Sequence, residues 1–586
     1  LSADIKLFPF LSFKSSLGLD ISRTSDESFL PKYYLNGTDQ VTNAKVGRGV
    51  GQRDYWVFEN YLSYNDKFGD HTVSTMVGTS AEKERYETVN ASKEGLVNND
   101  ANQQIINAAT KNPAASGSVS YHTMNSYFGR VFYSYADKYM ITANIRWDGS
   151  SNFADKHRWG VFPSVSGGWN FREESFIKDV VGDWFSQGKF RAAWGEIGNQ
   201  NISSGAYLTR YGNSTYYLLG NSMTPWLSGG RTNVGNPDLR WETTRQLDFG
   251  LDLAFFNSAL KFNIDYFDRK TSDMLVQVPM PAAIGLPNTP WSNAGSVKNR
   301  GFEFVLDYHG KIGNDFSYNI AGNISTYKNK VLSLGGGTNI PGKTHLGNQV
   351  NTMIEPGKPI GYFYGYKMDG VFQTQEEINN YRGGPDNTII MPTAEPGDLK
   401  FVDLNGDGKL GEEDRTMIGN PHPDFTFGLT LSGEYKGFDL SMFFQGSVGN
   451  DILNILKYDI YSGTGWYNAP KDIFDKFWTG PGSTNENFAI SANSRDNLTM
   501  SEWYIENGSY VRLKNVTLGY TFPKQWVQKL TVQNLRLFVA AQNLFTITSY
   551  SGLDPELGNS NPAFMGIDMG WYPQARSFMV GLSLKL

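Results

Sequence analysis

The chain has 586 residues, of which 39% are hydrophobic, and it carries a formal net charge of −6. It is longer than an ordinary soluble domain, yet no linker divides it. The mean hydropathy is −0.42, and no run of about 18 apolar residues predicts a membrane-spanning helix. The absence of cysteine excludes disulfides and thiolate metal sites. No basic run suggests nucleic-acid binding.

Residues 126–148, SYFGRVFYSYADKYMITANIRWD, show the pattern that recurs along most of the chain. Side chains alternate between the two faces of a strand, so residues two apart share a face. One face carries Ile141, Ala143, Ile145 and Trp147, and the other carries Thr142, Asn144, Arg146 and Asp148. This alternation is typical of a transmembrane antiparallel β-barrel. The alternative from composition is a large soluble all-β protein, since 14% aromatic residues suit either class.

Period-two alternation predicts about seventeen strands, each long enough to cross a membrane at a tilt. In chain order they lie near 1–8, 10–22, 54–65, 71–80, 126–136, 139–148, 160–170, 188–198, 241–256, 259–273, 299–309, 315–327, 424–435, 437–447, 508–522, 533–548 and 576–586. The last segment, SFMVGLSLKL, places Phe578, Val580, Leu582, Leu584 and Leu586 on one face. An apolar C-terminal strand of this kind suits the closing strand of a barrel.

The connections alternate between short and long, as in bacterial barrels with short periplasmic turns and long extracellular loops. Short links lie at Asp66–Gly69, Ala136–Lys138, Asn257–Ser258, Gly310–Asp315 and Tyr435–Gly437, and residues 172–185 predict a short helix on the same side. Long loops are expected at 23–53, 81–125, 199–240, 274–298, 328–423, 448–507 and 549–575. A soluble sandwich has no reason to segregate its loops in this way.

The strand count predicts that the chain is part of a larger barrel. With seventeen strands, the first and last run in the same direction and cannot pair antiparallel. Large plugged transporters have 22 strands, which places five strands ahead of Leu1. Residues 1–586 are therefore expected to be the C-terminal part of such a barrel, beginning in mid-domain without a signal peptide.

Several segments together resemble the SusC/RagA-type TonB-dependent outer-membrane transporters. They are NSYFGRVFYSYADKYMITANIRWDGSSNF, RWGVFPSVSGGWNFREESF, GNPDLRWETTRQLDFGLDL, GDLKFVDLNGDGKLGEEDRTMIGNPHPDFTFGL, SYVRLKNVTLGYTFP, LRLFVAAQNLF and YSGLDPE, in the family's order. The resemblance implies a 22-stranded barrel with an N-terminal plug, a SusD-type surface lipoprotein, and energy from the TonB–ExbB–ExbD complex. Neither plug nor TonB motif is in this sequence, and the last residue is Leu586 where the family usually has an aromatic.

Residues 403–414, DLNGDGKLGEED, have the spacing of a calcium-binding loop. Asp403, Asn405 and Asp407 supply oxygens at positions 1, 3 and 5, Lys409 supplies a carbonyl, and Asp414 closes the loop. An aspartate at position 12 reaches less far than the usual glutamate. The alternative is a surface turn rich in Asp, Asn and Gly. We expect a bound Ca²⁺ to brace the loop at 328–423.

No catalytic residue is predicted, and we do not expect an enzyme. The six histidines are scattered, and the sequence holds no HExxH, P-loop or G-x-S-x-G motif. Aromatic residues of the predicted long loops are candidates for stacking on sugar rings or packing against peptide side chains; the alternative is that they pack loops together or onto the lipoprotein. These residues are Tyr216, Tyr217, Trp226, Trp291, Trp466, Tyr467 and Trp571.

The sequence therefore favours an active importer in the outer membrane of a Gram-negative bacterium, acting on a nutrient too large for porins. The resembling family includes importers of oligosaccharides and of oligopeptides, and the residues do not separate these two. A non-transporting surface receptor or assembly scaffold built on the same barrel is the alternative. A secreted glycan-active enzyme of all-β fold is disfavoured by the loop alternation and the missing site. No organic cofactor is expected.

Overall fold

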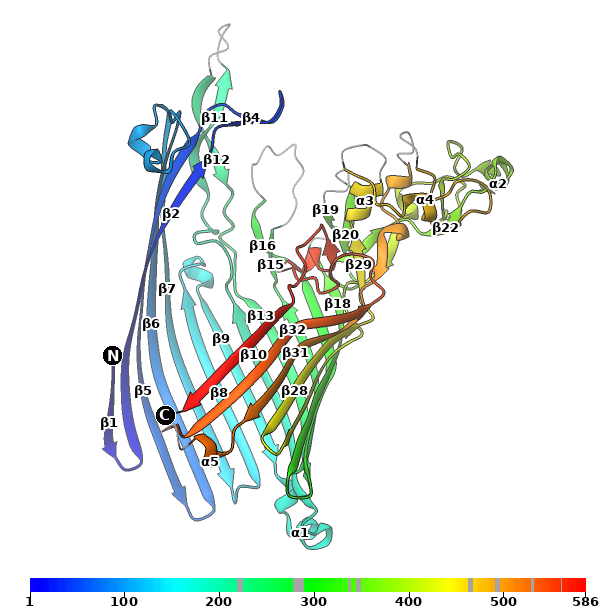
Figure 1. Cartoon of the computed structure of the whole chain (residues 1–586). Coiled ribbons are helices and arrows are strands. Elements are labelled where there is room, and N and C mark those ends of the chain that lie inside the picture. Colours follow the sequence, from blue (N-terminus) through cyan, green and yellow to red (C-terminus); the bar gives the residue numbers. More distant parts are fainter. Residues whose placement is uncertain are drawn as a thin grey trace. The chain divides into compact units, whose positions relative to one another are not determined.

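The computed structural model describes residues 1–218, 225–277, 289–335, 339–343, 349–461, 467–490, 496–527, 532–559 and 561–585. Strands dominate this part of the chain (Figure 1). Within it, seventeen strands belong to one large sheet. No described helix is both long and apolar enough to cross a membrane. The chain divides into two compact units, and each is described by itself.

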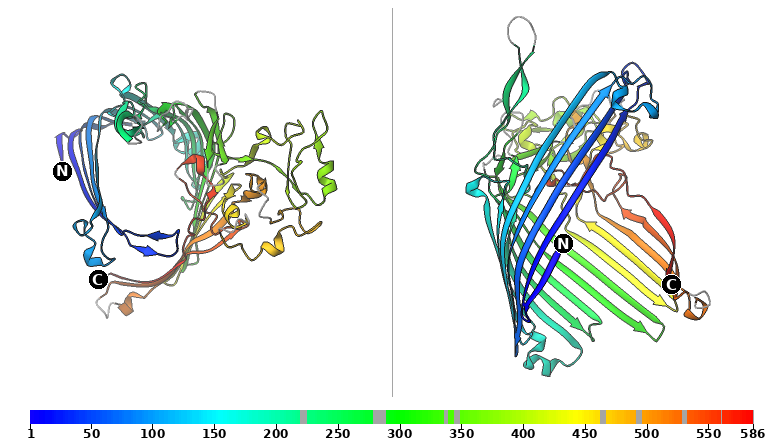
Figure 2. Two further views of the ribbon diagram at one scale, coloured as in Figure 1. Left: turned by 90° about the horizontal axis from the view of Figure 1, so that it is seen from above. Right: turned by 90° about the vertical axis from the view of Figure 1, so that its left-hand side faces the viewer.

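The first unit comprises residues 1–169, 193–245 and 273–293. Its strands pair antiparallel with their neighbours in chain order, and they lie side by side in Figure 2. They are β1 (Ser2–Phe8), β2 (Leu11–Leu30), β5 (Lys45–Phe68), β6 (His71–Glu94), β7 (Lys111–Tyr135), β8 (Tyr139–Ser150) and β9 (Trp159–Trp169). Small hairpins join β3 (Tyr33–Tyr34) to β4 (Gln40–Val41), β11 (Arg210–Leu218) to β12 (Pro225–Asn233), and β15 (Leu275–Gln277) to β16 (Trp291–Asn293).

The second unit comprises residues 170–192, 246–272 and 294–586. Two strands, β10 (Phe185–Asn199) and β13 (Glu242–Phe255), have residues in both units. The other main strands of the second unit are β14 (Leu260–Ser272), β17 (Ser296–Ile312), β18 (Phe316–Ser333), β27 (Phe425–Tyr435), β28 (Phe438–Val448), β31 (Tyr510–Thr521), β32 (Asn534–Thr548) and β34 (Ser577–Lys585). From β14 to β34 they pair antiparallel in this order.

Shorter elements lie between the main strands of the second unit, α1 and α5 in its short connections and the others in its long ones. Helices are α1 (Ser175–Val181), α2 (Gln375–Asn380), α3 (Leu456–Tyr461), α4 (Ile473–Lys476) and α5 (Lys524–Val527). Strands are β19 (Ile340–Lys343), β20 (Val350–Ile354), β21 (Tyr362–Gly365), β22 (Met368–Val371), β23 (Arg382–Gly383), β24 (Thr388–Ile389), β25 (Leu399–Phe401), β26 (Thr416–Gly419), β29 (Asp451–Asn454), β30 (Ile505–Asn507) and β33 (Ile567–Asp568).

The large sheet confirms the seventeen predicted strands and the short turns that join them. Ala136 and Asp137 both have a positive φ, 52° and 54°, the backbone that a tight antiparallel hairpin requires. The short helix expected within 172–185 is α1. On β8, Ile145 and Trp147 are 54% and 49% exposed whereas Asp148 is 7% exposed, so the predicted division into an apolar and a polar face is also confirmed.

The predicted loops at 23–53 and 81–125 are wrong over much of their length. There β2, β5, β6 and β7 continue as paired strands of 20 to 25 residues, although a transmembrane strand needs only about 9–11. The extensions are rich in Ser, Thr, Gly and Asn, as in TSDES (24–28) and AASGSVS (114–120). They show no apolar period, so pairing with neighbouring backbone, rather than side-chain pattern, keeps them extended.

Aromatic residues mark both ends of the apolar face in the first unit. Trp147 and Trp159 pack edge to face with ring centroids 5.4 Å apart, and Tyr127 stacks on Trp159. At the turn end of the same strands, Tyr139 lies opposite Tyr135 and Trp169. Tyr139 and Trp147 are the ends of a nine-residue stretch of β8, and a tilted transmembrane strand needs about 9–11 residues to cross. These two groups therefore have the positions expected of the two interfacial girdles.

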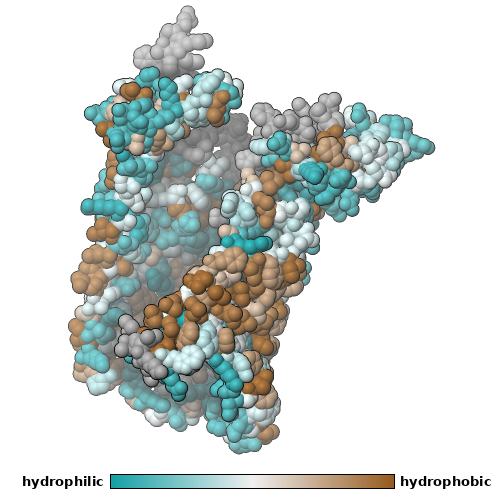
Figure 3. Space-filling view, viewed as in Figure 1, coloured by the Kyte–Doolittle hydropathy of each residue, from teal (hydrophilic) through white to brown (hydrophobic). Residues whose placement is uncertain are grey.

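The apolar face of the second unit is continuous over its C-terminal strands. On β34, Phe578 and Val580 are each 75% exposed. Phe578 lies in register with Ala541 on β32, and the same row continues through the pairings of β31 and β28. Figure 3 shows hydrophobic side chains gathered over these strands. The residues between them, such as Asp439 and Arg536, lie on the polar face.

Candidate functional site

The polar face of β8 in the first unit is held by hydrogen bonds between side chains. Asn144 Nδ2 donates to Ser164 Oγ on β9 at 3.0 Å. Arg146 donates through Nε to Asp148 Oδ1 at 2.7 Å and through Nη2 to Ser126 Oγ at 3.0 Å. These polar groups thus find partners on their own face, which explains why the strand tolerates them opposite four apolar side chains.

A row of ion pairs crosses β2, β5 and β6 on the same face. Arg53 Nη1 lies 2.7 Å from Asp20 Oδ2, and its Nη2 lies 2.6 Å from Glu84 Oε2. Beside it, Tyr55 donates to Glu82 Oε2 at 2.7 Å. The side chains of Arg53, Asp20 and Glu84 are each about a third or more exposed. The row therefore lines a surface that contacts solvent or another segment, and it is not part of a buried core.

The polar face of the second unit has the same character. Arg191 on β10 donates to Asp252 on β13 through two nitrogens, each at 2.8 Å, and to Asp265 on β14 at 2.9 Å. On β32, Arg536 Nε donates to Asp439 Oδ1 on β28 at 2.8 Å. Paired charges of both signs on one face, with an apolar opposite face, are suited to a solvated or plugged lumen.

The long connections of the second unit fold into a lobe with its own core. Its centre includes Phe363, Phe372, Leu399, Phe401 and Tyr504, which are all 1% exposed or less. The core draws on residues between 363 and 567. Thr374 caps α2 by accepting from the Glu377 N–H at 3.2 Å. The loops predicted at 328–423 and 448–507 therefore contribute to a packed structure wherever they are described.

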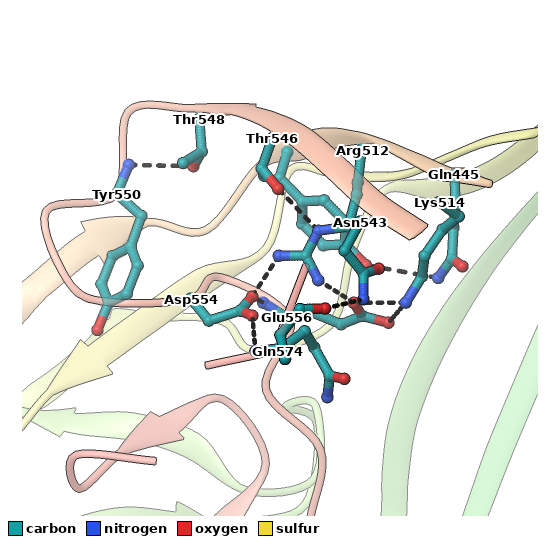
Figure 4. A network of polar contacts seen from close by, with 12 residues as sticks. Gln445, Arg512, Lys514, Asn543, Thr546, Thr548, Tyr550, Asp554, Glu556 and Gln574 are labelled. Carbon is teal, nitrogen blue, oxygen red and sulfur yellow. Dashed lines mark hydrogen bonds and ion pairs between the residues drawn. The ribbon is translucent and has the colours of Figure 1, made fainter. Parts of the chain in front are cut away.

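A cluster of charges, the clamp, joins β31 to the segment between β32 and β34 (Figure 4). It consists of Arg512, Lys514, Asp554 and Glu556. Arg512 Nη2 donates to Asp554 Oδ1 at 2.6 Å and Nη1 to Glu556 Oε2 at 2.5 Å. Lys514 Nζ lies 2.8 Å from both oxygens of Glu556. The Arg512 and Asp554 side chains are 4% and 8% exposed, whereas those of Lys514 and Glu556 are 23% and 27% exposed. The Arg512–Asp554 pair is therefore the buried part of the clamp.

Hydrogen bonds hold the Asp554 carboxylate of the clamp in its charged form. Burial favours a higher pKa for Asp554, but the Gln574 N–H and the Arg512 guanidinium stabilise its charge and bring the pKa below its ordinary value. Arg512 Nε also donates to Thr546 Oγ1 at 2.7 Å. Each nitrogen of the guanidinium thus has an acceptor, the condition under which a buried charge is stable.

The same segment is also attached to the lobe. Tyr550 donates to Asp568 Oδ2 at 2.6 Å, and burial raises the pKa of Tyr550. Glu506 accepts from the Ser551 N–H and hydroxyl, each at 2.9 Å. In β33, Ile567 pairs parallel with Leu453 of β29. Residues 549–575 therefore connect the large sheet to the lobe, a role that sequence reasoning missed.

In the predicted calcium loop, side-chain oxygens accept hydrogen bonds from backbone N–H groups. Asp403 accepts from Gly406 and Gly408 at 2.7 and 2.8 Å, and Asp407 accepts from Lys409 at 2.8 Å. Asp414, fully buried, accepts from Leu404, Asn405 and Gly411. Across the described residues, no three His, Cys, Asp or Glu side chains gather as metal ligands do. The calcium site stays a prediction.

The predicted loop aromatics do not form one cluster among the described residues. Tyr216, Tyr217 and Trp226 lie on the β11–β12 hairpin, where only the backbone is described, and Trp466 lies outside the described residues. Trp291 is half-buried and packs against the core that includes Phe153 and Trp241. Tyr467 and Trp571 are 63% and 53% exposed. Trp571 Nε1 donates to the Ile567 carbonyl at 3.2 Å.

Comparison with known proteins identifies the family. Residues 2–544 match the family described as TonB dependent receptor-like, beta-barrel. The chain is 34% identical over 599 residues to TonB-dependent receptor P3 of Formosa agariphila, covering 98% of this chain and 56% of that protein. It is 30% identical over 591 residues to TonB-dependent receptor SusC of Bacteroides thetaiotaomicron, covering 98% of this chain and 54% of that protein.

The solved structure of the RagAB peptide transporter superposes with a TM-score of 0.83, at 22% sequence identity. That match covers 100% of this chain and 61% of the compared chain, and at this identity it shows the fold. The chain spans a little over half the length of its curated relatives. The alternating faces, the segregated loops and these matches agree: the chain belongs to the SusC/RagA-type TonB-dependent receptors, which are β-barrel proteins of the outer membrane.

Proposed function

We propose that this chain forms the wall and outer lobe of an active importer for a nutrient too large for porins. The observation that carries the proposal is the paired charge on the polar face of each unit, at Arg53 in the first and at Arg191 in the second. Such a lining favours a hydrated passage filled by a plug. The proposed action is binding and movement rather than bond chemistry.

The proposed partners are a SusD-type surface lipoprotein and the TonB–ExbB–ExbD complex. A lipoprotein would close over the long-loop end, where the lobe displays the exposed side chains of Tyr467 and Trp571. Exposed aromatic rings bind amphipathic surfaces, including sugar rings and peptide side chains. TonB would act through the N-terminal plug of the whole protein. Family membership supports both partners.

The proposed substrates are oligosaccharides or oligopeptides. The RagAB structure is named as that of a peptide transporter, which supports a peptide, whereas nothing in the polar face excludes a glycan. The test is uptake of isotope-labelled oligosaccharide and oligopeptide pools by cells with and without the gene. Loss of accumulation of one pool in the deletion strain identifies the substrate class. Equal accumulation of every pool, with surface binding reduced, would instead indicate a non-transporting receptor.

We also propose that the loop at 403–414 binds Ca²⁺ and braces the lobe. A cation would draw Asp403, Asn405, Asp407 and Asp414 toward one point with the Lys409 carbonyl, in exchange for some of the backbone hydrogen bonds. We expect Ca²⁺ to slow limited proteolysis of this loop and EGTA to reverse the effect. Asp407→Asn should abolish that protection, whereas Glu376→Gln on α2 should retain it. Cleavage at the same rate with Ca²⁺ and with EGTA would contradict the proposal.

A further inference from the structure

A cluster of basic side chains lies on the apolar face of β14, β17 and β18, at the end nearer the long loops. The ladder places Ile264, Phe304 and Ile324 in one row, and Tyr266, Phe302 and Thr326 in the next. The following two rows are Asp268–Arg300–Lys328 and Lys270–Lys298–Lys330. Residues two apart share a face, so these charges continue the face that carries the apolar side chains.

The cluster has more cations than acidic partners. Lys298 Nζ pairs with Asp268 Oδ2 at 2.7 Å. Arg300, Lys328, Lys330 and Lys270 are exposed, and no ion pair joins any of them to a described acidic residue. Arg300 lies directly opposite Lys328, and Lys298 lies opposite both Lys270 and Lys330. Like charges in directly opposed positions destabilise a sheet, and an anion bound between them would remove that repulsion.

A hollow of about 330 Å³ lies at the first of these basic rows. Arg300 and Lys328 line it together with Tyr266, Phe302, Thr326, Tyr327 and Asp424. The rings of Tyr266 and Phe302 are 5.1 Å apart and separate the basic rows from the apolar row of Phe304. Aromatic pairs in this position mark the membrane interface. The hollow therefore lies where lipid headgroups meet the barrel.

In the first unit, basic side chains on the lipid-facing side of β6, beyond the aromatic girdle, have acidic partners within the protein. There, Lys83 and Arg85 follow Ala81 on the corresponding face of β6, and Lys83 lies over the Tyr121 ring at 5.8 Å. Arg85 pairs with Glu87 and lies 3.7 Å from Asp54. Around Arg300 the acids are fewer: Asp268 lies opposite Arg300 but pairs with Lys298, and Asp424 lines the hollow. Two carboxylates thus face five basic side chains, and an external anion would improve this balance.

We propose that Arg300, Lys328 and Lys330 bind the phosphate groups of a phosphorylated glycolipid in the outer leaflet of the outer membrane. A guanidinium binds phosphate through paired N–H donors, and the two ammonium groups act as point charges beside it. The neighbouring apolar rows suit acyl chains, which distinguishes this lipid from a soluble phosphate. The site faces away from the polar lining and is independent of the transported nutrient.

The test is native mass spectrometry of the detergent-purified receptor titrated with diphosphoryl lipid A and with the same lipid after phosphate removal. The variant is R300Q/K328Q/K330Q. The matched control is K261Q/K311Q/K436Q, which removes three positive charges at the short-turn end. We expect the variant to bind diphosphoryl lipid A about tenfold more weakly than the control, with the difference shrinking at high salt. The dephosphorylated lipid should bind both proteins equally.

Heat-modifiable gel mobility checks that each variant is folded; if the triple variant fails this check, K328Q alone should still weaken binding about threefold. Equal binding of diphosphoryl lipid A to a folded variant and the control would overturn the proposal. So would displacement of the lipid by millimolar inorganic phosphate, because the site would then be one for a soluble anion.

Discussion

Arg512→Ala should be among the most damaging single substitutions in the clamp. Arg512 is 4% exposed and holds Asp554, which is 8% exposed and would remain buried without this partner. Removing one member of a buried ion pair costs about 3–5 kcal/mol. We expect rapid proteolysis of residues 549–575 and a lower temperature for the loss of heat-modifiable mobility. The same measurements on Arg536→Ala, whose side chain is 30% exposed beside Asp439, provide the control.

A double variant separates charge burial from simple loss of packing. Arg512→Met with Asp554→Leu removes both charges and keeps most of the side-chain volume, which is often neutral for a buried pair. It should be more resistant to proteolysis than Arg512→Ala. If Arg512→Ala were as stable as Arg536→Ala, the segment at 549–575 would not depend on the clamp.

Ala143→Arg should destabilise the barrel more than the same change at its neighbour. Ala143 lies midway between Tyr139 and Trp147, on the face bounded by the two aromatic groups. An arginine facing lipid near the bilayer midplane costs about 2–4 kcal/mol, and the penalty falls toward the interfaces. Ile145→Arg, nearer Trp147, should therefore cost less. Urea-induced unfolding in lipid vesicles, followed by tryptophan fluorescence, measures both.

Asn144→Arg is the matched comparison, because Asn144 lies on the polar face and bonds to Ser164. That change should leave the unfolding midpoint close to the parent value and alter uptake instead. Similar destabilisation by Ala143→Arg and Asn144→Arg would show that the two faces of β8 do not meet lipid and lumen as assigned.

The alternation of apolar and polar residues predicted the large sheet well, because each membrane strand places an apolar side chain on the same face at every second residue. The same criterion missed the extensions, where residues such as Gly47, Gly49 and Gly51 carry no side-chain signal. There the ladder itself determines the structure: Gly49 lies opposite Asp26 on one side and Asn90 on the other. Long strands of this kind can be recognised only once their partners are known.

The clamp and the basic cluster were also missed, for different reasons. Arg512 and Asp554 are separated by 42 positions, so only the fold brings them together. Arg300, Lys328 and Lys330 do show a signal, since K-N-R (298–300) and K-N-K (328–330) place cations two apart. Their significance depends on the register that sets the two segments side by side. For the calcium loop, the spacing of the oxygen-bearing residues is visible in the sequence. That spacing does not specify whether the side-chain oxygens bind a cation or accept hydrogen bonds from the backbone.

We propose active import with energy delivered through TonB. The most direct measurement is time-resolved uptake of the labelled substrate pool in a tonB-deficient strain and in parent cells whose proton gradient has been dissipated. Binding at the cell surface should persist in both, while accumulation beyond the bound amount should stop. Accumulation at the parental rate without TonB would show passive diffusion and contradict active import.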